Sequence, residues 1–235
     1  MINYKAIFFD AAGTLISTSR PVGESYALLA RRYGIGVDPG ELTRRFRSCF
    51  AAAPPLAFPG VPAGRIKQVE RQWWKDLVRT IFEPFGSFTR FDDYFAELFE
   101  YFSRAEAWSL YPEVQDTLFS LRRRGLNVTI ISNFDSRLFG ILDGLGISTW
   151  VDSVVISSQA GYAKPAREIF LQALDLHQIK AEEAMHVGDS PENDASGACA
   201  AGLTGVLLDR NGNGASHSYL RVRTLTEILG VIGAR

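Results

Sequence analysis

The chain has 235 residues, of which 46% are hydrophobic and 22% are charged. This composition is typical of a globular protein with a sizeable core, and it excludes a disordered chain. The formal net charge is −1, so the sequence offers no basic excess for nucleic acid or an anionic membrane, and no apolar run reaches the ~20 residues that span a bilayer.

Short apolar runs that end in polar residues recur along the chain, and each predicts a buried strand of a parallel sheet. These runs cover residues 4–10, 127–132, 150–156, 184–188 and 205–209. Helical patterns lie between them at residues 114–124, 165–176 and 194–201. Strand–helix alternation implies right-handed crossovers and helices on both faces. The sequence therefore predicts an α/β protein with a Rossmann-like, three-layer parallel-sheet core.

Residues 17–107 interrupt this alternation. Apolar residues there recur at spacings of three and four, notably in 26–33, 65–82 and 91–102, which indicates amphipathic helices. Prolines in 51–62 predict a loop. We therefore expect a helical cap domain at 17–107, inserted into a discontinuous core domain formed by 1–16 and 108–235.

Polar side chains stand where the predicted strands end. Asp10, Ser132 and Asp189 each lie at the carboxyl end of a strand, and Lys164 lies at the start of a predicted helix. Ligands of open parallel sheets bind beyond the carboxyl ends of the strands, so these residues are expected to converge. A single carboxylate at such a position is often only a turn former or helix cap.

The order of these motifs resembles the haloacid dehalogenase-like hydrolase superfamily, subfamily I, in which a helical cap follows the first motif. The four motifs match residues 10–15, 131–133, 163–165 and 188–194. The run 132–138 is similar to one eukaryotic and cyanobacterial branch of that superfamily. The resemblance implies a Mg²⁺-dependent phosphatase that acts on a small phosphorylated metabolite.

The resemblance also implies roles for particular residues. Asp10 would attack phosphorus and form an aspartyl-phosphate, with Lys164 as the second catalytic group. The phosphate would be bound by Thr14, Ser132, Asn133 and Lys164. Mg²⁺, which prefers oxygen ligands, would be held by Asp10, the backbone oxygen of Ala12, Asp189 and Asp194, the last directly or through water.

One position departs from the superfamily pattern. Phosphatases of this type carry a second aspartate two residues after the nucleophile, where it protonates the leaving group and then activates water. Here that position is Ala12. General acid–base catalysis raises reaction rates by about 10²–10⁴-fold, so turnover is expected to be weak. Turnover would be retained if the substrate or the cap supplied an acid, or if the leaving group could depart unprotonated, as in an acyl phosphate.

Three alternatives stay open at this point. Carbon–phosphorus cleavage, as in phosphonoacetaldehyde hydrolases, would need a cap lysine, and the cap offers Lys67 and Lys75. A second alternative is a non-catalytic protein that binds a phosphorylated ligand or a partner. Dehalogenation is disfavoured, because dehalogenases of this superfamily need no metal and have a less acidic fourth motif, whereas Asp189 and Asp194 are retained here.

Other residues are given structural interpretations. His186 lies in an apolar strand run and is expected to be a core residue, and Cys199 is expected to be buried among small residues. Asp135 and Arg137 are expected to form a local ion pair or helix cap, with substrate contact at the cap boundary as the alternative. The insert's remaining candidates for substrate contact, by default on solvated helix faces, are Arg20, Arg44 and Arg45. Two distant cysteines make no disulfide framework, and with a strand starting near residue 4 we expect no signal peptide and a cytoplasmic protein.

Overall fold

The computed structural model describes residues 3–212 and 219–233. Its centre is a six-stranded sheet with the order β5-β4-β1-β6-β7-β8, in which every pair of neighbours is parallel. The strands are β1 (Ala6–Phe9), β4 (Asn127–Ser132), β5 (Ser153–Ile156), β6 (Ala184–Gly188), β7 (Thr204–Leu208) and β8 (Leu220–Val222). The predicted α/β class with a parallel sheet is confirmed.

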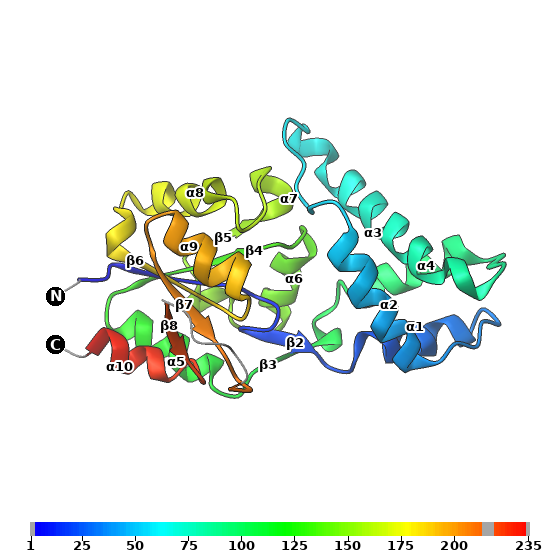
Figure 1. Ribbon diagram of the computed structural model, residues 1–235, viewed down its shortest axis with the longest axis horizontal. Helices are drawn as coiled ribbons and strands as arrows, with labels where there is room; N and C mark the ends of the chain where they lie inside the picture. The colour runs from blue at the N-terminus through cyan, green and yellow to red at the C-terminus, as the bar shows by residue number, and fades with distance from the viewer. Residues whose placement is uncertain (1–2, 213–218, 234–235) are drawn as a thin grey trace.

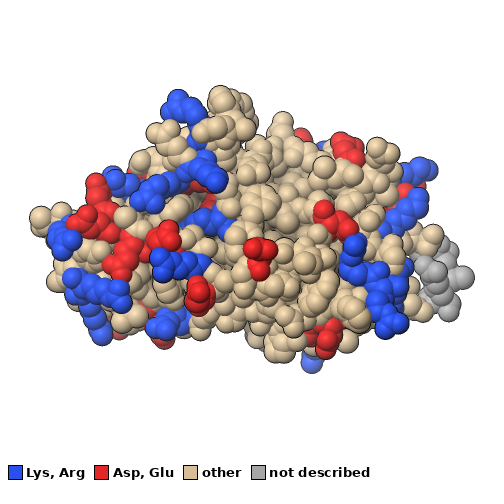
Figure 2. All heavy atoms as spheres, turned by 180° about the vertical axis from the view of Figure 1, so that it is seen from behind, with Lys and Arg blue, Asp and Glu red and all other residues tan. Residues whose placement is uncertain are grey.

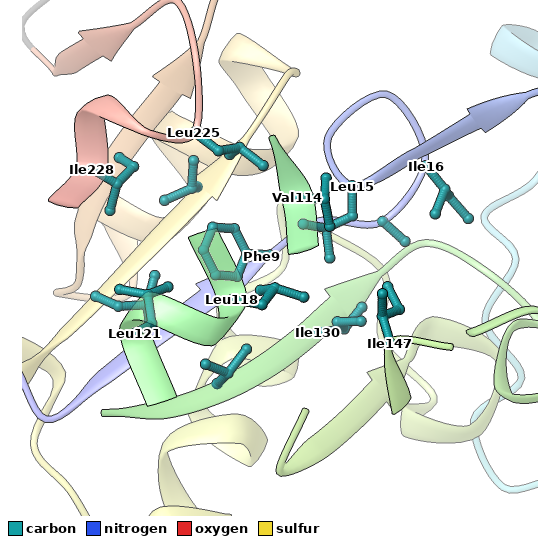
Figure 3. Close-up of a cluster of buried hydrophobic side chains, with 14 of the residues drawn as sticks. Phe9, Leu15, Ile16, Val114, Leu118, Leu121, Ile130, Ile147, Leu225 and Ile228 are labelled. Atoms are coloured by element: carbon teal, nitrogen blue, oxygen red, sulfur yellow. The ribbon is translucent and has the colours of Figure 1, made fainter. Parts of the chain in front are cut away.

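Helices cover both faces of this sheet, as Figure 1 shows. Side chains of a strand alternate between faces, so Ile7 and Phe9 point to one side and Ala6 and Phe8 to the other. The first side packs against α5 (Val114–Arg123), α6 (Arg137–Gly144) and α10 (Glu227–Gly233). The opposite side packs against α8 (Arg167–His177) and α9 (Gly197–Ala200). Figure 3 shows Phe9 and the α5 residues Leu118 and Leu121 in the first of these cores.

Four helices between β1 and α5 form a separate cap, on the right in Figure 1. They are α1 (Val22–Arg31), α2 (Pro39–Ala52), α3 (Ile66–Phe82) and α4 (Phe91–Tyr101), and they enclose their own aromatic-rich core. The chain enters and leaves this region through two short antiparallel strands, β2 (Ile16–Thr18) and β3 (Trp108–Leu110). The predicted domain boundaries at 16/17 and 107/108 fall at these two strands.

Shorter elements complete the described chain. They are α7 (Ser157–Ala160), a π-helix at Pro191–Ser196, and single 3₁₀ turns at Ala63–Arg65, Glu83–Phe85, Ala105–Ala107, Ser148–Trp150 and Ala181–Glu183. Several predictions of detail were wrong. The helix predicted at 165–176 begins at Arg167, the strand predicted at 150–156 begins at Ser153, and the helix predicted at 194–201 is split by the π-helix. Cys199, which was predicted to be buried, is exposed, and it lies next to the end of the four-residue helix α9.

Basic and acidic side chains are interspersed on the surface. Figure 2 shows this mixture on the face opposite to that of Figure 1, most clearly over the cap on the left. Within residues 3–212 and 219–233, no helix has the length and apolarity that crossing a membrane would require.

Neighbouring residues on α5 provide a test of the sheet core. Leu118 is fully buried, whereas Phe119 is 49% exposed. We expect Leu118→Ala to lower the free energy of unfolding by about 2–5 kcal/mol, because it leaves a cavity against β1 and β4. Phe119→Ala removes more atoms but should cost less than about 1 kcal/mol. Urea denaturation of both variants measures this, and equal losses would contradict the assignment of the buried face.

Candidate active site

Asp10 and Lys164 form a buried ion pair where the strands end. Asp10 follows β1, and its N–H donates to the carbonyl of Val187 in β6 at 2.9 Å. Nζ of Lys164 lies 2.7 Å from Oδ1 of Asp10. Ser132, the last residue of β4, donates its hydroxyl to the same oxygen at 3.1 Å. The structure therefore brings together residues from three distant segments at the edge of the sheet where we expected them.

Asn133 fixes the segment that carries Lys164. Its side-chain amide donates to the carbonyl of Lys164 at 2.9 Å and accepts the N–H of the same residue at 2.7 Å. This reciprocal pair ties the 163–165 turn to the end of β4. Asn133 thus has a positioning role that the sequence did not predict, in addition to the phosphate-binding backbone N–H implied by the family resemblance.

Three carboxylates gather at the same place. Oxygen atoms of Asp10, Asp189 and Asp194 lie within 4.8 Å of one another. Asp189 packs against the backbone of Gly13, whose φ is +94° and where a Cβ atom would approach Oδ2 of Asp189 to 2.2 Å. Only glycine fits this position, both because of its backbone conformation and because of the carboxylate beside it.

Asp194 is held by donors on both of its oxygens. Oδ1 lies 2.5 Å from Nζ of Lys164 and 2.9 Å from Nε2 of His186, while Oδ2 accepts the N–H of Ser190 at 3.0 Å. Burial lowers the pKa of His186. Because an ionised carboxylate can only accept hydrogen bonds, Nε2 of His186 is the donor in its contact with Asp194. His186 is buried in the core, as predicted, yet it also touches the site by orienting Asp194.

The charges of the cluster perturb one another. Burial raises the pKa of Asp10, against the opposing effect of Lys164. The residue Asp189 is exposed, but the surrounding protein desolvates its carboxylate and raises its pKa to about 7. Repulsion from Asp10 and Asp194 raises this pKa further. Burial acts in the same direction on Asp194, but Lys164 and His186 hold its pKa below the usual value. Burial acts to lower the pKa of Lys164, and the two aspartates raise it instead.

This donor set fits a hard divalent cation. Three carboxylates share one ammonium, so their negative charge exceeds the positive charge beside them, and repulsion from Asp10 and Asp194 adds to the burial that raises the pKa of Asp189. Oxygen ligands of this kind are those that Mg²⁺ prefers. Asp10, Asp189 and Asp194 would hold the ion, and the fourth predicted ligand, the backbone carbonyl of Ala12, belongs to an exposed residue of the adjoining loop.

The loop after Asp10 is anchored by an arginine that sequence reasoning missed. Arg210 donates from Nη2 to the carbonyl of Thr14 at 2.9 Å, pairs with Glu113 at 2.5 Å, and lies 3.7 Å above the ring of Tyr111. Thr14 itself is fully buried, and its hydroxyl has no hydrogen-bond partner among the described residues. No motif points to Arg210, since it follows β7 and lies 196 positions from Thr14.

Close to this site, the buried carboxylate of Glu70 links the cap to the core by hydrogen bonds. Oε1 of Glu70, on α3, accepts hydrogen bonds from the N–H and hydroxyl of Ser136 at 3.0 and 2.8 Å and from the hydroxyl of Ser158 at 2.6 Å. Glu70 is only 2% exposed. Trp74, one turn further along α3, donates to Asp135 at 2.6 Å. These contacts hold α3 against the segment that follows Asn133.

Asp135 and Arg137 form the local pair predicted from the sequence. The guanidinium of Arg137 contacts both carboxylate oxygens of Asp135, at 2.8 and 2.6 Å, and its N–H donates to the same carboxylate at 2.9 Å. The guanidinium also lies over the rings of Trp74 and Phe99 of the cap, at 4.9 and 4.1 Å. Arg137 thus stacks on the cap while it remains paired with the core.

A cleft between cap and core opens above Lys164 and Asn133. Its cap side is formed by the loop at 53–59 with Phe50, Ala51 and Trp73, and its core side includes residues 161–166 and Asn193. The loop predicted at 51–62 therefore forms part of the cleft. Trp73 donates to the carbonyl of Pro54 at 3.0 Å and fixes the loop in place.

The other cap cations predicted as candidates lie elsewhere. Lys67, Arg20 and Arg44 are exposed, and Arg44 pairs with Glu41 at 2.6 Å within α2. Lys75 on α3 pairs with Asp92 on α4 at 2.9 Å. Arg45 donates to the carbonyls of Ile81 and Thr80 at the end of α3. None of these five cations is among the described residues that line the cleft.

Known proteins resemble this chain along most of its length. Residues 4–202 match the family model described as a haloacid dehalogenase-like hydrolase. The human protein named haloacid dehalogenase-like hydrolase domain-containing protein 3 is 36% identical over 211 residues, which cover 88% of this chain and 82% of that protein. This match agrees with the branch to which the run 132–138 is similar.

Solved structures agree in fold. A HAD phosphatase from Thermococcus onnurineus is 25% identical with a TM-score of 0.68, and the match covers 97% of this chain and 98% of that one. A 2-haloacid dehalogenase from Pseudomonas syringae pv. Tomato DC3000 has a TM-score of 0.70 at 21% identity, with 98% and 99% covered. At that level of identity, the second similarity shows a shared fold and not a shared reaction.

Asp189 should make the stability of the metal-free protein depend on pH. Its pKa rises from 3.8 to about 7 on folding, so the folded state binds this proton more tightly than the unfolded chain. Ionisation of Asp189 therefore costs stability progressively as pH rises through this interval. We expect Asp189→Asn to raise the melting temperature in EDTA at about pH 8, and the gain to shrink towards about pH 5.

The matched control for this experiment is Asp175→Asn, which changes an exposed carboxylate on α8. Thermal unfolding across the pH range compares the two variants. An Asp189→Asn difference that stayed constant with pH would contradict the raised pKa.

Glu70 provides a test of cap docking. Glu70→Ala should lower the free energy of unfolding by about 1–3 kcal/mol, because donors on Ser136 and Ser158 lose their buried acceptor. The exposed Gln68 on the same helix is the control, and Gln68→Ala should be near neutral. Chemical denaturation measures both, and a neutral Glu70→Ala would show that these hydrogen bonds do not hold the cap.

Proposed function

The chain belongs to the haloacid dehalogenase-like hydrolase family, and on this basis we propose that it is a Mg²⁺-dependent phosphatase. Its substrate would be a small phosphorylated metabolite, attacked by the carboxylate of Asp10. The observation that supports this proposal best is the placement of Asp10, which pairs with a buried ammonium and a serine hydroxyl beside two further carboxylates.

The residues of the site have complementary tasks in this reaction. The Asp10 carboxylate would attack phosphorus and displace the leaving group, forming an aspartyl-phosphate. The hydroxyl of Ser132 and the N–H of Asn133 would bind the phosphoryl oxygens, and Lys164 would compensate charge on both the phosphate and Asp10. A bound Mg²⁺ would supply the remaining positive charge that lets an anionic nucleophile approach a phosphate.

The arrangement of the two cap lysines favours cleavage of a phosphorus–oxygen bond over cleavage of a carbon–phosphorus bond. That alternative needs a lysine at the substrate, yet Lys67 is exposed and Lys75 pairs with Asp92. The acidic cluster likewise favours a metal-dependent reaction over dehalogenation, because a metal-free site would leave three carboxylates facing a single ammonium. A protein that binds a phosphorylated ligand without turnover remains as an outcome of the experiment below.

We expect Asp10→Asn to abolish Mg²⁺-dependent release of phosphate. The substitution keeps the size of the side chain but removes the nucleophile, so the rate should fall by at least about 10³-fold. A panel of phosphorylated metabolites with Mg²⁺ measures this, with Asp175→Asn as the control.

Three results would contradict the proposal. Absence of activity above that of Asp10→Asn, with Mg²⁺ and phosphate still bound, would favour a binding protein. Halide release from 2-haloacids in EDTA would favour a dehalogenase. Trapping of a lysine adduct by borohydride, with an aldehyde substrate, would favour carbon–phosphorus cleavage.

A further inference from the structure

The two half-reactions at Asp10 make different demands for a proton. When an ester is cleaved, the departing alkoxide must be protonated, and when the aspartyl-phosphate is hydrolysed, the attacking water must lose a proton. In the superfamily pattern that the sequence resembles, the residue at position 12 serves both needs, and the methyl group of Ala12 can serve neither. The question is whether another group near Asp10 takes over.

The titratable groups around Asp10 are already engaged. Lys164 donates to both Asp10 and Asp194, and Asp194 accepts three hydrogen bonds. His186 is fully buried behind Asp194 and donates to it, so it cannot reach a substrate. Asp189 packs on Gly13 and belongs to the carboxylate set that fits a metal ion.

The cap does not supply a replacement either. Among the described residues that line the cleft above Lys164, there is no aspartate, glutamate or histidine, and the lining consists mainly of alanine, proline and aromatic side chains. Among the described residues that line a second, apolar pocket between cap and core, bordered by Phe134, Trp108 and Arg137, there is likewise no aspartate, glutamate or histidine. Asp209 borders a third pocket near Gly13, where its carboxylate pairs with Arg221 at 3.4 Å and accepts the N–H of Gly212.

We propose that this protein takes its phosphoryl group from acyl phosphates and then retains it on Asp10, so that the phosphorylated form accumulates. The inference rests on the proposed function, since it uses the same nucleophile and the same metal dependence. It adds a substrate class, the mixed anhydrides of phosphoric and carboxylic acids, and a long-lived covalent state.

The bonds and protons of this sequence balance without an acid at position 12. A carboxylate oxygen of Asp10 attacks phosphorus, the bond from phosphorus to the acyl oxygen breaks, and the carboxylate leaves with the electron pair. That leaving group is a stable anion at neutral pH and needs no proton. Hydrolysis then requires water to attack phosphorus and give up a proton, and without a base this second step is slowed by about 10²–10⁴-fold. The aspartyl-phosphate is therefore formed faster than it is lost.

The test is to incubate the full-length protein with acetyl phosphate and Mg²⁺, quench it in acid, and measure its intact mass. We expect most chains to gain the mass of one phosphoryl group, with borohydride reduction locating the label at Asp10. Asp10→Asn should remain unlabelled. Ala12→Asp, which restores the missing acid–base group at an exposed position, should show little label and release phosphate about 10²-fold faster or more.

A chase supplies a second measurement that needs no variant. The phosphorylated wild-type protein, separated from acetyl phosphate, should keep its label through repeated sampling. Rapid loss of the label, or steady Asp10-dependent release of phosphate without any label, would overturn the inference and leave the proposed phosphatase standing. The proposed function would fail as well if neither the wild type nor a folded Ala12→Asp variant were labelled, and if neither released phosphate from any compound of the metabolite panel.

Discussion

A concentration of negative charge at the carboxyl ends of the strands is the constraint on which the rest of this structure depends. Three aspartates face one ammonium within a largely buried site. A buried lysine is tolerable only where partners compensate its desolvation, and Lys164 has two. The segments that end β1, β4 and β6 must therefore stay in register with the 163–165 turn. Asn133 enforces this by binding both backbone polar groups of Lys164.

Much of this arrangement follows from local patterns in the sequence. Strands β1, β4 and β6 are continuous apolar runs, because both faces of a parallel sheet are covered, and polar residues directly after such runs must lie at one edge. The two strands at the cap junction escaped prediction, since each has three residues and pairs with a segment some ninety positions away. Cys199 was wrongly expected to be buried because a run of small residues does not reveal how much of each side chain its surroundings cover.

The attachment of the cap shows a different limit of sequence reasoning. A glutamate on an amphipathic helix is expected to face water, yet Glu70 is buried because three donors converge on one of its oxygens. Those donors come from Ser136 and Ser158, 66 and 88 positions away, and serines carry no sign of such a partnership. Arg137 likewise contacts both parts of the molecule, because it pairs with Asp135 of the core and stacks on an aromatic ring of the cap. Polar contacts thus join the two parts of the molecule, and apolar surface is left to line the space between them.

The loop after Asp10 keeps a fixed backbone geometry but lacks a side chain at position 12 that could transfer a proton. Its backbone is tied down by hydrogen bonds from Gly13 to Ile16 and from Thr14 and Leu15 to Ala11, and by Arg210 at the carbonyl of Thr14. None of these contacts uses the side chain at position 12, so an alanine there leaves the charge-binding geometry intact. Electrostatic binding of a phosphoryl group depends on that geometry, whereas proton transfer depends on the missing side chain. If the proposed function holds, a site built in this way would accept a phosphoryl group and release it to water only slowly.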